Sequence, residues 1–235
     1  MSEPRLPVRE TRALNRVTKA MAKGMKASVE NLALSEASRE IDVTALKSYR
    51  AQLLESGVSG LSLNTMLLGA TARAVASQPL LNAELIDNQI VIYEPVNLGM
   101  AVATPAGLIV VVLREADQLS LAELGKMAAD KVERARSGKL QLEDIEGGTF
   151  TLSNLGMFGV DRGFPIPRPP ESAILLLGAI KPRPVVVDGQ IVSRETMWAT
   201  VTFDHRFIDG AAAAAFLQAF SDLTASPQSW IKVDK

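Results

Sequence analysis

The 235-residue chain contains no cysteine and a single histidine, His205. The lack of cysteine excludes disulfides, thiolate nucleophiles and zinc–sulfur sites within this sequence. With one imidazole and no thiolate, we expect no metal site. A base that titrates near neutral pH without a large pKa shift can only be His205.

Charge excess and long apolar runs are also missing. The 25 Lys and Arg residues nearly balance the 26 Asp and Glu residues, which predicts no nucleic-acid footprint. The apolar runs at 108–113 and 173–180 have the length of strands, so we expect no membrane span. There is no apolar secretory segment, and we expect a cytoplasmic protein.

The first 28 residues are basic and poor in acids, as mitochondrial transit peptides are. Leu14, Val17, Met21 and Met25, however, recur at helical spacing. An amphipathic helix that belongs to the fold explains the same residues, and it is the interpretation that the sequence favours.

The pattern along the chain predicts one α/β domain with a mixed sheet and flanking helices. Residues 1–12 are interpreted as an arm or linker remnant, and residues 13–235 as the domain. Helices are expected up to Ser28, from an Asp42 N-cap to Ser56, from Ser62 or Asn64 to before Pro79, over 119–137, and after Gly210. Strands are expected at 89–93, 97–104, 108–114, 149–153, 173–180, 185–187, 191–192 and 197–203, with 31–43 extended and a hairpin at Asp188-Gly189.

His205 is predicted to lie on a turn between a buried strand, 197–203, and a tightly packed helix that begins after Gly210. Rigid elements on both sides of a turn commonly fix catalytic groups. Asp209 could orient this turn through a buried salt bridge while His205 acts as a base. In the alternative interpretation the turn is solvated and both groups are merely polar.

Ser153 ends a hydroxyl-rich strand and meets a glycine turn in the run Thr151-Leu152-Ser153-Asn154-Leu155-Gly156. Such a serine could donate a hydrogen bond to a developing oxyanion. A strand-end serine that makes a local turn bond would have the same sequence. The segment 102–109, taken alone, indicates only a tight hairpin.

Together, in this order, the three segments resemble the catalytic domain of the dihydrolipoamide acyltransferases, the cores of 2-oxo acid dehydrogenase complexes. The resemblance covers about Leu14 to Pro227. It includes Asp42-Val43-Thr44-Ala45-Leu46, the stretch 97–108, Arg134-Ala135-Arg136-Ser137-Gly138-Lys139-Leu140, the Ser153 segment through Val160, and Asp204-His205-Arg206-Phe207-Ile208-Asp209-Gly210.

The resemblance implies a fold like that of chloramphenicol acetyltransferase and a homotrimer with active sites at subunit interfaces. It implies that His205 takes a thiol proton, that Ser153 stabilises the tetrahedral oxyanion on a neighbouring subunit, and that Asp209 helps to hold the site. Acyl groups would move between dihydrolipoamide and coenzyme A, without a metal. The lipoyl group would be carried in trans on a lipoyl-bearing domain, with 2-oxo acid dehydrogenase components as possible partners.

Departures from the family pattern keep alternatives open. Gly24 stands where a basic residue is usual, Val111 where proline is typical, and Arg168 where asparagine commonly precedes paired prolines. The changes at Gly24 and Arg168 lie in stretches that could line a substrate channel. A coenzyme A-dependent enzyme acting on a small alcohol or amine therefore remains an alternative, as does a non-catalytic core subunit.

The tail, 227–235, bears on assembly. Trp230 and Ile231 could anchor on a neighbouring trimer, but Lys232, Asp234 and Lys235 would place charges where family members bury apolar residues. Burying unpaired charge costs several kcal/mol. We therefore predict an isolated trimer, with a cubic cage as the alternative.

Overall fold

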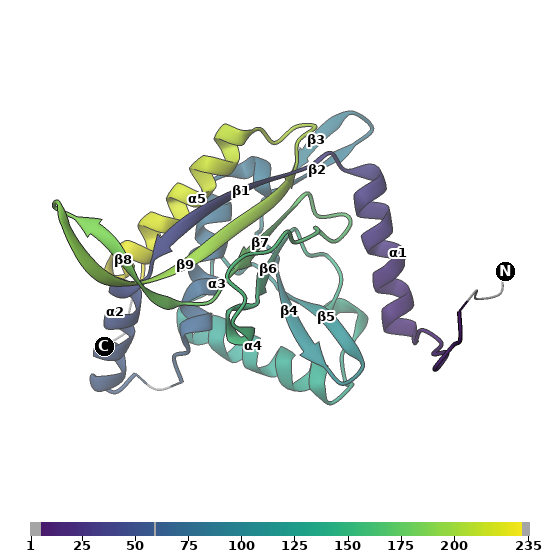
Figure 1. The fold of residues 1–235 in the computed structure, drawn as a ribbon, viewed down its shortest axis with the longest axis horizontal. Coiled ribbons are helices and arrows are strands. Elements are labelled where there is room, and N and C mark those ends of the chain that lie inside the picture. Colours follow the sequence, from purple (N-terminus) through teal and green to yellow (C-terminus); the bar gives the residue numbers. More distant parts are fainter. Residues whose placement is uncertain (1–5, 59, 232–235) are drawn as a thin grey trace.

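The computed structural model describes residues 6–58 and 60–231, and its central element is a mixed sheet (Figure 1). In the described part of the chain, seven strands form this sheet in the order β1-β9-β7-β6-β4-β5, and β8 pairs with β9 outside this path. The strands are β1 (Leu34–Asp42), β4 (Leu98–Thr104), β5 (Gly107–Leu113), β6 (Phe150–Asn154), β7 (Ala173–Leu177), β8 (Lys181–Val187) and β9 (Gln190–Asp204). A separate hairpin pairs β2 (Ala83–Ile86) with β3 (Gln89–Ile92).

The middle of the sheet is parallel and its margins are antiparallel. β6 runs parallel to both β4 and β7, whereas β9 is antiparallel to β7, β1 and β8. β5 returns antiparallel to β4 through a tight turn at Gly107, whose φ of 128° lies in the region that favours glycine. The carboxyl end of β6 therefore lies in the middle of the sheet, between two parallel neighbours.

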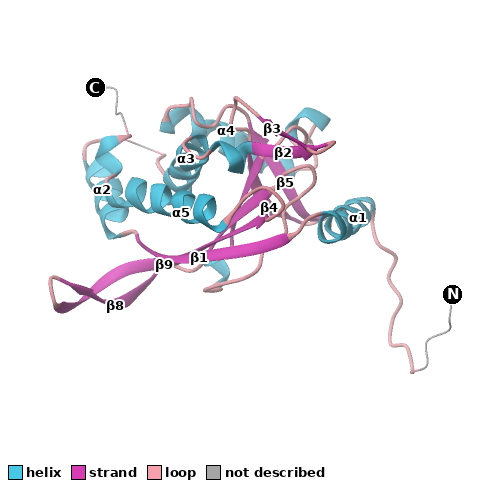
Figure 2. Cartoon of the chain, turned by 90° about the horizontal axis from the view of Figure 1, so that it is seen from above, coloured by secondary structure: helices cyan, strands magenta, loops and turns pink. Residues whose placement is uncertain are grey.

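Four helices, α2 to α5, cover one face of the sheet, and α1 stands apart at the β5 edge (Figures 1 and 2). The α-helices are α1 (Arg16–Asn31), α2 (Thr44–Glu55), α3 (Leu63–Ala76), α4 (Leu121–Arg136) and α5 (Gly210–Ala225). Short 3-10 turns occupy Pro79–Asn82, Leu142–Asp144, Gly156–Phe158 and Pro227–Ser229. None of the helices in the described ranges is long and apolar enough to cross a membrane.

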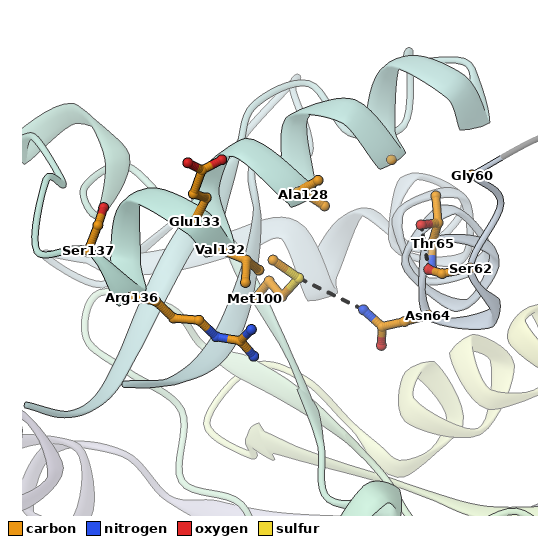
Figure 3. Close-up of a pocket in the computed structure, with 12 residues that line it drawn as sticks. Gly60, Ser62, Asn64, Thr65, Met100, Ala128, Val132, Glu133, Arg136 and Ser137 are labelled. Carbon is orange, nitrogen blue, oxygen red and sulfur yellow. Dashed lines mark hydrogen bonds between the residues drawn. The ribbon is translucent and has the colours of Figure 1, made fainter. Parts of the chain in front are cut away.

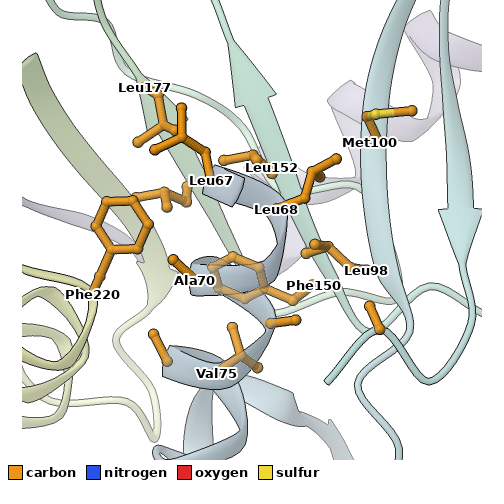
Figure 4. Close-up of a cluster of buried hydrophobic side chains, with 14 of the residues drawn as sticks. Leu67, Leu68, Ala70, Val75, Leu98, Met100, Phe150, Leu152, Leu177 and Phe220 are labelled. Carbon is orange, nitrogen blue, oxygen red and sulfur yellow. The ribbon is translucent and has the colours of Figure 1, made fainter. Parts of the chain in front are cut away.

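The core lies between α3 and the sheet (Figure 4). α3 is apolar nearly all round, as a helix surrounded by protein must be, and most of its residues are buried. Phe150 of β6 packs against Phe216 of α5, with ring centroids 5.4 Å apart. Phe150 and Leu152 face this core, so the intervening Thr151 and the following Ser153 point to the opposite face of the sheet.

The last described residues pack on their own chain. The Cζ3 atom of Trp230 lies 3.0 Å from where a Cβ would stand on Gly69 of α3, and the indole N–H donates to the Leu223 carbonyl at 2.9 Å. The Arg73 guanidinium stacks 4.9 Å from the centre of the same ring. Ile231 is also buried. Both candidate anchors of the tail are thus used within the chain, and the charged residues Lys232, Asp234 and Lys235 lie outside the described residues.

Most predicted elements are confirmed, including the helix near the amino terminus, the α/β class and the Asp188-Gly189 hairpin. Two strand predictions were wrong in detail. The two strands expected at 191–192 and 197–203 are one strand, β9, and the strand expected to reach residue 180 ends at Leu177. β2 was not predicted.

The predicted N-cap at Asp42 was also wrong, because Asp42 is the last residue of β1 and Val43 caps α2. The Asp42 carboxylate still accepts a hydrogen bond from the Thr44 N–H at 2.8 Å. Of the two caps proposed for α3, the structure has Ser62, whose hydroxyl accepts from the Thr65 N–H.

Candidate active site

The turn between β9 and α5 is fixed by Asp204, the last residue of β9, whose side chain is fully buried. Its carboxylate accepts hydrogen bonds from the Ala33 N–H at 3.2 Å and from the Arg206 N–H at 3.1 Å. The Arg206 guanidinium adds contacts of 3.0, 2.9 and 2.6 Å. These charge-assisted bonds tie the turn to the chain segment that enters β1, and they raise the pKa of Arg206.

The backbone of His205 is held by a hydrogen bond, whereas its side chain is exposed. Its N–H donates to the Ala33 carbonyl at 2.8 Å, and its ring lies 5.5 Å from the Phe203 ring, centroid to centroid. Phe203 is itself buried in the core. The imidazole is therefore presented at the surface from a rigid base, as a group that must meet a substrate requires.

Asp209 caps α5. Its carboxylate accepts from the Ala212 N–H at 2.7 Å, which satisfies one of the free donors of the first helical turn. Asp209 is exposed and its side chain forms no ion pair within 6–58 and 60–231, so of the two interpretations of this turn the buried salt bridge of Asp209 is not found. Asp204 makes that bridge instead, and the sequence interpretation gave Asp204 no separate role.

Ser153 is half-buried near the end of β6. The next residue, Asn154, secures the turn that follows: its amide donates to the Asn64 side-chain oxygen at 3.1 Å, and its own oxygen accepts from the Gly156 N–H at 3.0 Å. Gly156 is required, because a Cβ there would lie 2.6 Å from the Gly178 carbonyl oxygen. The serine thus sits on a strand whose exit is tightly fixed.

Ser153 and His205 do not meet within one subunit. Ser153 lies beside Leu176 of β7, which lies beside Thr200 of β9. His205 follows Thr200 by five positions, and β9 is two strands away from β6, so the two residues are separated by roughly 15–20 Å. The sheet fixes this separation, and a site that uses both residues needs a second copy of the chain.

A buried carboxyl supports the strand of Ser153 from the sheet face opposite the helices. Glu171 accepts from the Thr151 hydroxyl at 2.5 Å and from the Arg168 guanidinium at 3.1 Å. Burial raises the pKa of Glu171 above its usual value, although Arg168 and Thr151 act in the opposite direction. Arg168 also donates to the Ile145 carbonyl at 2.8 Å, so its guanidinium serves this internal network.

A pocket of about 730 Å³ opens between the amino end of α3 and the second half of α4 (Figure 3). Met100, Ala128 and Val132 supply apolar lining, whereas Asn64 and Arg136 supply polar groups. This lining could hold a ligand with both apolar and polar parts. No group of three or more His, Asp or Glu side chains that could bind a metal occurs in the part of the chain that the structure describes.

The fold is that of chloramphenicol acetyltransferase, whose structure superposes with a TM-score of 0.55 at 14% sequence identity and covers 86% of this chain and 94% of its own. A much greater similarity is found to the dihydrolipoamide acetyltransferase of Azotobacter vinelandii. That structure has a TM-score of 0.88 and 33% identity and covers 97% of this chain and 99% of its own.

Residues 7–232 match the 2-oxoacid dehydrogenases acyltransferase catalytic domain, and the chain belongs to that family. A curated relative is the mitochondrial dihydrolipoyllysine-residue succinyltransferase component of the 2-oxoglutarate dehydrogenase complex of Saccharomyces cerevisiae. It is 36% identical over 230 residues, which cover 96% of this chain and 50% of the relative. The chain therefore spans about half the length of the curated relatives that it matches.

The Azotobacter vinelandii structure was determined in an investigation of a serine, a histidine and an asparagine in the catalytic mechanism of that enzyme. Its serine precedes its histidine by 52 positions, and its asparagine follows the histidine by four. Ser153, His205 and Asp209 have the same two spacings, 52 and four, with aspartate in place of asparagine.

Proposed function

We propose that this domain transfers an acyl group between a dihydrolipoyl thiol, borne on a lysine of a protein domain, and coenzyme A. The proposal is supported by family membership and by the matching spacing of Ser153, His205 and Asp209. The curated relative acts in succinyl transfer and the solved one in acetyl transfer, so the proposal is made for the acyl group as a class.

In the proposed reaction, His205 takes the proton of the attacking thiol. An ordinary thiol loses its proton to an imidazole at modest cost. The thiolate attacks the thioester carbonyl, and the Ser153 hydroxyl donates to the tetrahedral oxyanion. Collapse of this intermediate breaks the original carbon–sulfur bond, and His205 returns the proton to the departing thiolate.

Transfer is direct, because the chain has no cysteine for an acyl-enzyme and the substrate thiolate is itself a good nucleophile. Asp209 contributes by fixing the first turn of α5, and with it the turn that carries His205.

The proposal that each active site lies between two subunits is supported by the distance between Ser153 and His205 within one chain. We place each active site between two subunits of a homotrimer, with His205 from one subunit and Ser153 from its neighbour. A closed threefold arrangement makes three equivalent sites from three copies of the same interface.

Mixed trimers test this arrangement. Alone, His205→Ala should lower kcat by about 100- to 10,000-fold and Ser153→Ala by about 100- to 1,000-fold, in the transfer of acetyl from acetyl-coenzyme A to free dihydrolipoamide. Co-expressed in equal amounts with different affinity tags, the two variants should recover about a quarter of wild-type activity, because about one interface in four then pairs an intact histidine with an intact serine.

The control is the same two variants purified separately and mixed without subunit exchange, which should stay inactive. If co-expressed mixed trimers show only the summed residual activity of the two variants, the shared site is refuted. If His205→Ala retains activity within a few-fold of wild type, the acyltransferase mechanism itself is refuted.

A further inference from the structure

The outer face of α1 carries a row of cationic side chains: Arg16, Lys19, Lys23 and Lys26. Their spacing of three, four and three residues places all four within about a quarter of the helix circumference, over about 15 Å of helix length. All four side chains are exposed. We call this row the basic stripe.

The opposite face of α1 holds the helix on the body of the subunit. The Ser28 hydroxyl is buried and donates to the Pro167 carbonyl at 2.5 Å. A Cβ on Gly24 would lie 3.9 Å from the Pro169 ring, and a Cβ on Gly107, in the β4–β5 turn, would lie 3.9 Å from Cγ1 of Val17. The face used for packing and the basic stripe thus point in opposite directions.

Little negative charge compensates the stripe. Among the described residues, the only ion pair that a member of the stripe makes is Lys26 with Glu30, at 3.4 Å, and both of these side chains are largely exposed. Glu30 is also the only acidic residue of α1. The helix therefore presents a net positive surface on a protein whose overall charge is nearly zero.

The basic stripe leads to His205. α1 ends at Asn31, and two residues later the Ala33 carbonyl accepts the hydrogen bond from the His205 N–H. A pocket of about 230 Å³ lies between the last turns of α1, at Ala27 and Asn31, and Arg206, the neighbour of His205. A macromolecule bound along the stripe would stand directly beside the catalytic turn of the same subunit.

The geometry points to the basic stripe as the docking surface for an acidic face of the protein domain that carries the lipoyl-lysine. This inference rests on the proposed function, in which one substrate is a residue of a protein. A free thiol needs only the active site, whereas a protein-borne thiol must bring a whole domain to its entrance. Opposite charges at such an entrance accelerate productive encounter.

The test compares two acyl acceptors on the intact trimer: free dihydrolipoamide, and the isolated dihydrolipoyl domain of a succinyltransferase relative. Lys19→Glu/Lys23→Glu reverses the middle of the stripe. Its kcat/KM for the domain should fall by about 10- to 100-fold, while its kcat/KM for free dihydrolipoamide stays within about twofold of wild type. Raising the salt concentration from about 0.05 M to about 0.5 M should slow wild type with the domain and leave the variant nearly unchanged.

Lys126→Glu/Lys139→Glu is the matched control, since it makes the same change of charge at two exposed lysines on and just after α4, outside the basic stripe. It should leave the ratio of the two kcat/KM values unchanged. An equal loss for both acceptors in the stripe variant, or no loss for the domain, would overturn the docking surface. The docking surface would also be overturned if the basic stripe binds duplex DNA while the stripe variant acylates the dihydrolipoyl domain as well as wild type does. If wild type does not acylate free dihydrolipoamide at all, the proposed function fails, and the docking inference with it.

Discussion

Asp204→Ala should be among the most damaging single substitutions outside the apolar core. The carboxylate is fully buried, and its removal leaves the Ala33 and Arg206 N–H groups without their acceptor. Breaking a buried ion pair commonly costs 3–5 kcal/mol, but the Arg206 side chain is 41% exposed and water can solvate it. We therefore expect a loss of about 3 kcal/mol in the free energy of unfolding.

Asp204→Asn tests the contribution of the negative charge separately from that of the hydrogen bonds. Its side-chain oxygen can still accept from both backbone N–H groups, but it offers the guanidinium an amide in place of a carboxylate. The expected loss is smaller, about 1–2 kcal/mol. In acyl transfer to free dihydrolipoamide, kcat should fall about tenfold or more for Asp204→Ala, with little change in KM, because a turn without its anchor positions His205 less well for the chemical step.

Urea unfolding measures the change in the free energy of unfolding. All variants are compared at one protein concentration, since an oligomer's apparent stability depends on concentration. Activity is assayed at a temperature at which each variant remains folded. If Asp204→Ala unfolds within about 0.5 kcal/mol of wild type, a change typical of ordinary surface substitutions, the anchoring role of the carboxylate is wrong.

Three further outcomes are expected. Burial raises the pKa of Glu171, so the folded state binds the carboxyl proton more tightly than the unfolded state does. The protonated carboxyl therefore contributes stability below the unfolded pKa of about 4.3, and this contribution is lost as pH rises through the folded pKa. Glu171→Gln should therefore flatten the decrease in urea midpoint as pH rises above about 4.3, and an unchanged slope would contradict the assignment. Asp209→Ala removes the α5 cap and should cost about 0.5–2 kcal/mol of unfolding free energy and part of the activity, whereas equal melting temperature and full activity would count against it. Because Trp230 packs on its own α3, light scattering should give a trimer of about 75 kDa, and a particle of 24 or more subunits would show that other residues join trimers.

Much of the fold follows from periodicity and caps, because these signals are local. The run of β-branched and aromatic residues predicted the second half of β9, and the helical repeat predicted α4. Residues 193–196 of β9 were not predicted, for a physical reason: 193–195 pair only with β8, in a hairpin that extends from the body, so no buried face marks them as a strand. β2 was missed likewise, as a four-residue strand in a separate ribbon.

The candidate site was predicted less completely than the fold. His205 was identifiable because it is the only histidine, and the structure does place it on the strand-to-helix turn that the sequence predicted. Asp204 and Glu171 each have one partner far away in sequence, Ala33 and Thr151, and no local pattern marks such contacts. The nearest available signal was the position of Asp204 itself, a carboxylate that ends a strongly apolar strand and must therefore be paired.

The extended hairpin of β8 and β9 has a consequence for solubility. β8 pairs with β9 along its whole length, and its other edge is open in the described structure. Pro182 and Pro184 alternate along β8, and since they do not interrupt its pairing with β9, their ring nitrogens face the open edge. An incoming strand would find no N–H donors at these two positions. The hairpin can therefore extend into solvent without serving as a template for sheet-to-sheet aggregation.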